Sequence, residues 1–189
     1  MLSLFRRAPQ TATIDALYGA IVAQARTPVF YRGYAVPDTV NGRLDLLMLH
    51  LALVFERLSQ AGKDPAALGQ ALFDRFCQDM DDHLREQGVS DLKVPKDMRQ
   101  LGAAFFGRHG TYMKALKSRD RDALQAGLRR NIYSGAGRET GARLAAYMVA
   151  AMDSLNGQAA ERLCAGEVFW PDPDLVDATS AQIGQGDPS

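Results

Sequence analysis

The chain has 189 residues, in which 22 Lys and Arg balance 22 Asp and Glu, so its formal net charge is zero at pH 7. A neutral chain has no overall attraction for nucleic acid or anionic lipid, so we expect no specific nucleic-acid partner. No stretch reaches the ~18 uninterrupted apolar residues of a membrane span, and the length is that of one domain that folds without metals or disulfides.

The first predicted helix covers residues 13–25. Its apolar side chains recur at the i, i+3, i+4, i+7 spacing of an amphipathic helix, and Thr13 is suited to cap it. These side chains are Ile14, Leu17, Tyr18, Ile21, Val22 and Ala25. Residues 1–12 contain no apolar signal region, so we expect them to form a flexible N-terminal segment.

An aromatic, proline-containing loop over residues 28–39 precedes the most informative helix, predicted over residues 40–60. This helix carries apolar side chains on two sides, so it cannot lie on a surface, and we expect it at the centre of the fold. Asp38 or Thr39 is suited to cap its start. One side presents Leu44, Leu47, Met48, Leu51, Val54, Phe55 and Leu58, and the other presents Leu46, Leu49 and Leu53.

Further helical segments follow the central helix. One begins near Pro65 and ends at Gly88, a second is capped by Asp97 and runs to about residue 116, and a third is capped by Asp120. Helical periodicity resumes over residues 138–155, and a last piece ends near Cys164.

No alternating β-branched run is long enough for a strand, so the sequence predicts an all-α fold. We expect a single-domain bundle of six or seven helices over residues 13–166, followed by a disordered tail over residues 167–189 that is rich in Pro, Asp, Ser and Gly. Cys77 and Cys164 show no metal-binding spacing and are expected to be reduced, which favours a cytoplasmic or matrix-like compartment; we expect a cytoplasmic location.

An acidic patch on the third helix is the first candidate for chemistry. Asp79, Asp82 and Glu86 share a helix face and could hold Mg²⁺, as in all-α enzymes that ionise isoprenoid diphosphates. Such enzymes need a second facing cluster, which this sequence lacks, and Arg75 and Arg85 lie near the same surface. We therefore favour a solvated face and predict no metal site and no bound cofactor.

The three histidines do not form a zinc motif, because they lie on three different predicted helices without a paired spacing. His50 is expected to orient a buried hydrogen bond, and His109 is expected to be a core histidine with a satisfied ring. Lys93, Lys96, Arg99 and Arg108 form a basic cluster near two phenylalanines, for which nucleic acid, lipid and pairing with the acidic helix all remain open.

Three segments together resemble the ubiquinol-cytochrome c chaperone family, whose members are assembly factors of the cytochrome bc1 complex. The segments are FYRGYAVPDTVNGRLDLLMLHLALVFERL, LFDRFCQDMDDHLREQGVSDLKVPKDMRQLGAAFFGRHGTYMKAL and ALQAGLRRNIY. The resemblance covers about residues 14–155, and its motifs occur in the family's order.

The resemblance implies a non-catalytic, all-α protein that binds cytochrome b or an early bc1 assembly intermediate. Mitochondrial relatives act with a small co-chaperone and associate with the translating ribosome, so both are implied as further partners. The short N-terminus suits a bacterial-type member at the cytoplasmic side of the membrane, with peripheral membrane contact as a further expectation.

The family motif implies a set of structural or partner-contacting positions and no catalytic residue. At the entry to the central helix and after it, the candidates are Phe30, Tyr31, Pro37, Asp38, Thr39, Arg43, Asp79, Asp81, Arg85, Lys93, Lys96, Met98, Arg108 and Tyr112. We expect the aromatic loop to be the first place of client contact. Met80, Met98 and Met113 are candidates for an adaptable apolar surface, although methionine at helical spacing is more often core.

Two other classes of function remain open. The first is a protein that binds an isoprenoid or quinone tail, or a metal-dependent enzyme, with the Asp79 to Glu86 patch as the metal anchor. The second is a peripheral membrane adaptor whose anchor consists of Leu2, Leu4, Phe5, Arg6 and Arg7.

Overall fold

The computed structural model describes residues 4–137 and 140–177, with side chains from residue 11 onward. Within these residues the chain forms eight helices and no strand, and six of the helices are longer than two turns. The helices are α1 (Leu4–Ala25), α2 (Val29–Arg32), α3 (Val40–Ser59), α4 (Lys63–Glu86), α5 (Val94–Lys117), α6 (Arg121–Asn131), α7 (Ala142–Gly157) and α8 (Ala160–Cys164). The predicted all-α fold is confirmed.

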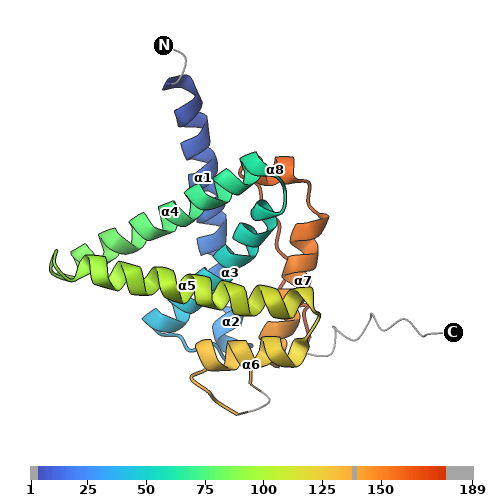
Figure 1. The fold of residues 1–189 in the computed structure, drawn as a ribbon. Coiled ribbons are helices and arrows are strands. Elements are labelled where there is room, and N and C mark those ends of the chain that lie inside the picture. Colours follow the sequence, from blue (N-terminus) through green and yellow to red (C-terminus); the bar gives the residue numbers. More distant parts are fainter. Residues whose placement is uncertain (1–3, 138–139, 178–189) are drawn as a thin grey trace.

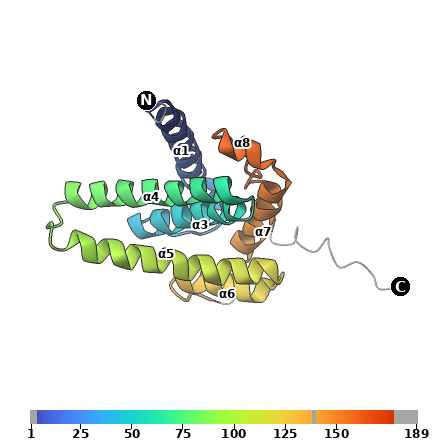
Figure 2. The ribbon, with the colours of Figure 1, turned by 45° about the horizontal axis from the view of Figure 1, so that its top comes forward.

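The predicted central helix is α3, which contacts α1, α4, α5 and α7. Its start is set by Thr39, whose side-chain oxygen accepts a hydrogen bond from the backbone N–H of Gly42 at 3.1 Å. Figures 1 and 2 show α3 enclosed by its neighbours, with α4 and α5 on either side of it in Figure 2. Both apolar sides of α3 are therefore covered, as the sequence predicts.

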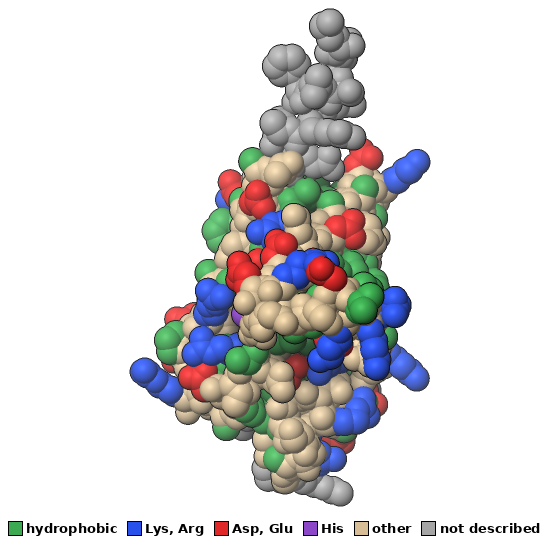
Figure 3. Space-filling model, turned by 90° about the vertical axis from the view of Figure 1, so that its left-hand side faces the viewer, with side chains coloured by type: hydrophobic (Ala, Val, Ile, Leu, Met, Phe, Trp, Pro, Cys, Tyr) green, Lys and Arg blue, Asp and Glu red, His purple; other side chains and the backbone are tan. Residues whose placement is uncertain are grey.

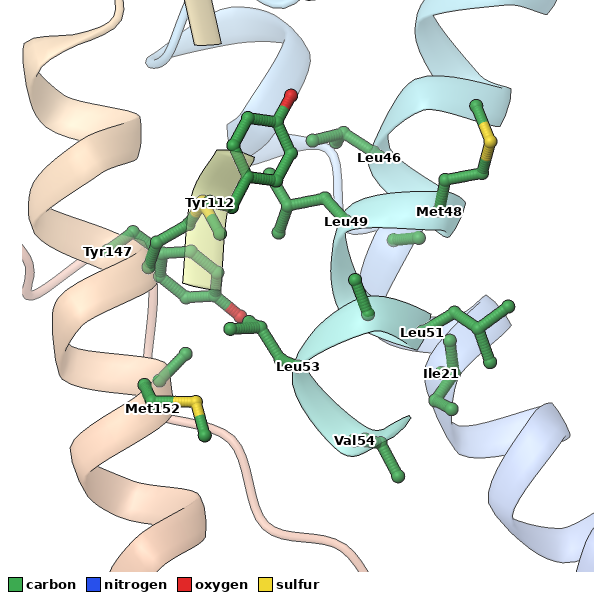
Figure 4. Close-up of a cluster of buried hydrophobic side chains, with 14 of the residues drawn as sticks. Ile21, Leu46, Met48, Leu49, Leu51, Leu53, Val54, Tyr112, Tyr147 and Met152 are labelled. Carbon is green, nitrogen blue, oxygen red and sulfur yellow. The ribbon is translucent and has the colours of Figure 1, made fainter. Parts of the chain in front are cut away.

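The core forms where side chains from both sides of α3 meet the surrounding helices. Leu49 and Leu53 point toward Tyr147 and Met152 of α7, while Leu51 lies beside Ile21 of α1 (Figure 4). Leu51 and Leu53 are both completely buried. Each fully buried side chain of this size contributes about 1.5–3 kcal/mol, so this one helix accounts for much of the stability of the fold.

The helices α4 and α5 form a hairpin that extends beyond the first turn of α3 (Figures 1 and 2). The end of α4 is closed by Gly88, which adopts a φ of +78°. The N–H of Gly88 binds the carbonyl of Arg85 at 2.9 Å, and the N–H of Val89 binds that of Leu84 at 3.0 Å. This pair of bonds is a Schellman motif, so Gly88 acts as the predicted C-cap.

Several helix boundaries differ from the prediction. Helix α1 begins at Leu4 and runs through Thr13, so Thr13 does not cap it. The prediction misses the first turns because the apolar periodicity starts only at Ile14. The 28–39 segment contains the short helix α2, and α5 begins at Val94, which leaves Asp97 in its first turn. Helix α7 begins only after Gly141, whose φ of +89° marks a reversal of the chain.

Residues 167–177, which we name the C-terminal strap, lie against the core, whereas their composition predicts a disordered tail. Val176 is buried, and Val168 and Trp170 pack against the core cluster. A composition rich in Pro and Asp concealed these apolar anchors, which have no helical periodicity. Residues 178–189 lie outside the described part of the chain.

We predict that Gly42→Ala destabilises the fold by about 2 kcal/mol or more. A Cβ atom at this position would lie 2.0 Å from the carbonyl oxygen of Pro37, so the turn that starts α3 would have to move. Chemical denaturation measures the change in the free energy of unfolding.

The matched control is Gly19→Ala in α1, where an added Cβ meets no atom within 4 Å. This control should be neutral or stabilising by up to about 1 kcal/mol, because alanine favours a helix over glycine. Equal effects of the two substitutions would contradict the predicted close contact at Gly42.

Candidate functional site

The aromatic segment before α3 is anchored in the core. Phe30 is completely buried, and its ring centroid lies 4.9 Å from that of Tyr147 and 5.4 Å from that of His50. A side chain in this position supports the fold and is not accessible to a client. Of the two roles that the motif leaves open for Phe30, structural and partner-contacting, its burial favours the structural one.

Beside Phe30, three candidate residues form a chain of contacts at the surface. The hydroxyl of Tyr31 donates to the carbonyl of Ala25 at 2.6 Å, and the guanidinium of Arg43 lies 5.3 Å from the Tyr31 ring centroid. Arg43 also pairs with Asp38 at 2.7 Å, and both side chains of this pair are more than half exposed. Asp38 and Arg43 are therefore available to a partner, while Tyr31 is half-buried.

A chain of hydrogen bonds runs through the centre of the molecule behind this segment. Nδ1 of His50 lies 2.8 Å from the carbonyl oxygen of Leu46, and Nε2 lies 3.0 Å from the hydroxyl of Tyr147. A carbonyl oxygen only accepts, so Nδ1 carries the proton and Nε2 accepts from Tyr147. Tyr147 in turn accepts from Gln24 of α1 at 2.9 Å, so the chain joins three helices, and the predicted buried hydrogen bond of His50 is confirmed.

Burial controls the protonation of His50 and Tyr147 in this chain of hydrogen bonds. His50 is completely buried, and burial lowers its pKa from 6.5 to about 4 despite the opposing hydrogen bond to Leu46. Burial also raises the pKa of Tyr147 above its ordinary value. Both side chains are therefore neutral at pH 7, and their role is to hold α1, α3 and α7 together.

The C-terminal strap is held mainly by Arg143, a residue that sequence reasoning missed. Its Nε donates to the carbonyl of Val176 at 2.8 Å, and its Nη2 lies 3.3 Å from the carbonyls of Pro173 and Asp174. The guanidinium also lies 4.3 Å from the ring centroid of Tyr34. The four-residue spacing of Arg143 and Tyr147 on α7 is the signal that could have placed Arg143 beside the aromatic cluster.

Two further contacts fix the strap. The side-chain amide of Gln158 accepts from the N–H of Phe169 at 2.9 Å and donates to its carbonyl at 2.8 Å. The ring of Trp170 meets that of His50 edge-on, with centroids 5.0 Å apart. The strap therefore covers the hydrogen bonds of His50 and excludes water from them. The indole N–H of Trp170 is buried and has no hydrogen-bond partner among the described residues.

In the acidic patch, Asp79 makes contacts within the fold, whereas Asp82 and Glu86 are exposed. Asp79 accepts a hydrogen bond from Tyr18 at 2.8 Å, and Asp81 pairs with Arg85 at 2.6 Å. Arg85 also pairs with Asp91, across the α4–α5 turn. Within the described residues, no three His, Cys, Asp or Glu side chains are grouped so that they could hold a metal ion.

Contacts of α5 with α3 and α6 involve two further candidates, Arg108 and Tyr112. Arg108 forms an ion pair with Asp45, and the buried hydroxyl of Tyr112 accepts from Asn131 at 3.1 Å. Burial raises the pKa of Asp45, although the charge and the hydrogen bond of Arg108 oppose this shift. Both candidates are therefore primarily structural, since they position α5 against its neighbours.

Glu56 is the second buried polar residue of α3. It lies 2.6 Å from Nζ of Lys117 and 2.9 Å from Nε2 of His109, although the ring of His109 is not aligned for a hydrogen bond. Burial raises the pKa of Glu56, but the bonds from Lys117 and Gln60 and the neighbouring charges outweigh burial and lower it. The ring of His109 therefore faces a carboxylate within the fold, although its Nε2 makes no hydrogen bond to a described residue.

One accessible region is the end of the molecule where the α4–α5 turn projects past the start of α3. Val40 is 69% exposed and Leu92 is 94% exposed, and Lys93 and Lys96 are exposed beside them in sequence. Half-buried apolar side chains from three helices are found in this half of the hairpin and at the start of α3: Leu44, Leu47, Met80, Leu84, Met98 and Leu101. Met113 is a core residue, which excludes it from an adaptable surface.

We name this region the open end and define it by Val40, Leu92, Met98 and the Asp38–Arg43 pair. It combines exposed apolar side chains with charged neighbours, which is the composition of a protein-binding surface. The side chains of Leu2, Leu4, Phe5, Arg6 and Arg7 lie outside the described part. No described helix combines the length and apolar composition needed to cross a bilayer.

Comparisons with known proteins agree on one relationship. Residues 32–170 match the family described as Ubiquinol-cytochrome C chaperone. The fold is similar to the crystal structure of the Cbp3 homolog from Brucella abortus, with a TM-score of 0.85 and 39% sequence identity over 93% of this chain and 99% of that chain. No curated protein sequence matches the chain.

We predict that the free energy of unfolding falls by about 3 kcal/mol through His50 alone as the pH falls from 6.5 to 4. The unfolded chain takes up a proton on this histidine near pH 6.5, whereas the folded protein does so only near pH 4. The contribution is therefore fully present above pH 6.5, falls progressively below it, and is lost below about pH 4. Denaturation at a series of pH values measures the slope.

The His50→Gln variant should show a smaller slope in this range, since glutamine does not titrate. The exposed His83 of α4 provides the matched control, and His83→Gln should keep the slope of the unmodified protein. If His50→Gln keeps that slope as well, His50 is not the buried neutral group described above.

We also predict that Arg143→Ala releases the C-terminal strap while the helices remain folded. The chain contains one tryptophan, so its fluorescence reports on the strap alone. Loss of the Arg143 hydrogen bonds should expose Trp170 and shift its emission to longer wavelength at unchanged helical circular dichroism. Arg130→Ala, at an exposed position of α6, should leave the emission unchanged, and an unshifted emission in Arg143→Ala would exclude this role of Arg143.

Proposed function

The chain belongs to the ubiquinol-cytochrome c chaperone family, and on this basis we propose that it is an assembly chaperone of the bc1 complex. The observation that carries the proposal is the family match over residues 32–170, which includes the central helix and the whole α4–α5 hairpin. The chaperone acts by binding and release and catalyses no reaction.

The finer part of the proposal is the client. We propose that the client is cytochrome b or an early intermediate that contains it, and that a small co-chaperone or the ribosome contributes to the same assembly step. A protein made of membrane-spanning helices exposes apolar surface before it is inserted. A chaperone for such a client needs an accessible apolar surface with a charged rim.

The open end meets this requirement better than the aromatic segment that the sequence first suggested. Phe30 is buried, whereas Val40 and Leu92 are exposed at the end of the structure where α3 starts and the α4–α5 turn projects. Met98 is half-buried, and an unbranched thioether side chain adapts to different partners. Asp38 and Arg43 supply charge at the rim. We therefore place the client at the open end.

The proposed location is the cytoplasmic side of the membrane that holds the bc1 complex, with peripheral contact to that membrane. Deletion of the gene in a host that makes the complex tests the function as a whole. We expect the level of assembled bc1 complex to fall and tagged cytochrome b to capture the chaperone. Normal levels of the complex after deletion would exclude the proposal.

We predict that Leu92→Asp reduces capture of the chaperone by tagged cytochrome b at least several-fold. Leu92 is 94% exposed, so the substitution should leave the stability within about 0.5 kcal/mol while placing a charge at an apolar contact. Leu175→Asp is the matched control, because Leu175 is 79% exposed on the C-terminal strap. Equal capture of both variants would place the client elsewhere on the molecule.

A further inference from the structure

The zero net charge of the chain conceals a division into a basic and an acidic part. Residues 93–133, which form α5, α6 and the turn between them, contain ten Lys and Arg but three Asp and Glu. The rest of the chain contains twelve Lys and Arg and nineteen Asp and Glu. Two neighbouring helices therefore carry an excess of seven positive charges, which the remainder balances.

The outer side of α5 presents part of this charge on one continuous face. Positions 96, 99, 103, 107, 110, 114 and 117 follow one another at intervals of three and four residues, so they share one side of the helix. The residues are Lys96, Arg99, Ala103, Gly107, Gly110, Lys114 and Lys117, and all are exposed. No acidic residue belongs to this set, which we name the α5 basic face.

The middle of the α5 basic face is low because its residues are small. Gly107 and Gly110 have open space where a Cβ atom would stand. Basic side chains lie at both ends, about 30 Å apart at the rise of an α-helix. Phe106, which is 46% exposed, flanks the small residues and adds an apolar side chain. A flat surface can therefore approach the helix closely along its whole length.

Most of the charge on this face is not used within the fold. Lys117 pairs with Glu56, but Lys96, Arg99 and Lys114 make no ion pair with any described residue. The turn between α5 and α6 adds Arg119, which is also exposed. Figure 3 agrees with this division, since Lys and Arg gather at its lower right, the side that faces the viewer in Figure 1, while Asp and Glu are concentrated in the upper half.

We propose that the α5 basic face is a docking surface for an anionic lipid bilayer. Phosphate groups of the lipids would lie against Lys96, Arg99 and Lys114, while Phe106 would enter the interface between headgroups and acyl chains. A surface of this kind attracts basic residues over about a Debye length. The acidic remainder of the molecule is repelled by the same surface, so the contact also sets one orientation.

The shape of the face favours a bilayer over RNA. The face is long and flat, and its middle is made of Ala103, Gly107 and Gly110. It carries the exposed amide of Gln100 but, among the described residues, no cluster of exposed aromatic rings on which bases could stack. An exposed phenylalanine gains free energy from an acyl-chain interface but little from a phosphate backbone. Docking of this kind does not depend on the identity of the client.

Flotation of the full-length protein with lipid vesicles tests the proposal. We expect binding to vesicles of phosphatidylcholine mixed with phosphatidylglycerol, no binding to phosphatidylcholine alone, and loss of binding at high salt. The variant Lys96→Glu/Arg99→Glu/Lys114→Glu should bind vesicles at least about tenfold more weakly, because each basic residue near an anionic surface contributes to binding. Circular dichroism establishes that the variant is folded, and the neutral variant Lys96→Gln/Arg99→Gln/Lys114→Gln replaces it if it is not.

The matched control reverses three exposed basic residues elsewhere, Arg26→Glu/Arg32→Glu/Lys63→Glu, and should bind within about twofold of the unmodified protein. Equal losses in the two triple variants would show a non-specific charge effect and overturn the proposal. Displacement of the protein from vesicles by single-stranded RNA, with binding to RNA lost only in the α5 variant, would assign the face to nucleic acid instead. A failure of vesicle binding leaves the proposed chaperone function intact, since capture by cytochrome b is measured separately.

Discussion

The fold depends on the burial of α3 on both of its apolar sides. A helix enclosed in this way must also satisfy its polar side chains inside the protein, because an unpaired buried polar group costs about 1–3 kcal/mol. His50 meets this condition through Leu46 and Tyr147, and Glu56 meets it through Lys117 and Gln60. The two residues thus require α7 and α5 at defined positions, and the arrangement of the bundle follows from the needs of one helix.

Two parts of the chain do not have to pack against α3. The far half of the α4–α5 hairpin extends past the start of α3, so its apolar side chains have no central helix to cover them completely. The outer side of α5 faces away from α3 and needs no apolar residue, which allows small and basic residues there. The same helix therefore serves the core with Phe105 and Tyr112 and remains available to the surroundings with Lys96 and Lys114.

The sequence predicts helices well where an apolar periodicity or a capping side chain marks them. The start of α3 at Thr39 and of α6 at Asp120 follow from side chains that bind the backbone of the first turn, and both caps are present. The start of α7 and the packing of residues 167–177 could not be predicted in the same way. Arg143 holds the strap through carbonyl groups, which every residue possesses, so the pattern of side chains contains no sign of the pairing.

At the candidate site, membership of the motif does not by itself identify the residues that contact a client. Phe30, Thr39, Arg108 and Tyr112 all belong to the motif that resembles the family, and each makes a contact that positions α3 or one of its neighbours. A motif of this kind is therefore mainly a signature of the fold. Residues that meet a client have to be accessible, and at the open end Val40 and Leu92 are strongly exposed although neither is among the candidate positions taken from the motif. Accessibility at the open end is thus a better guide to the client surface than membership of the motif.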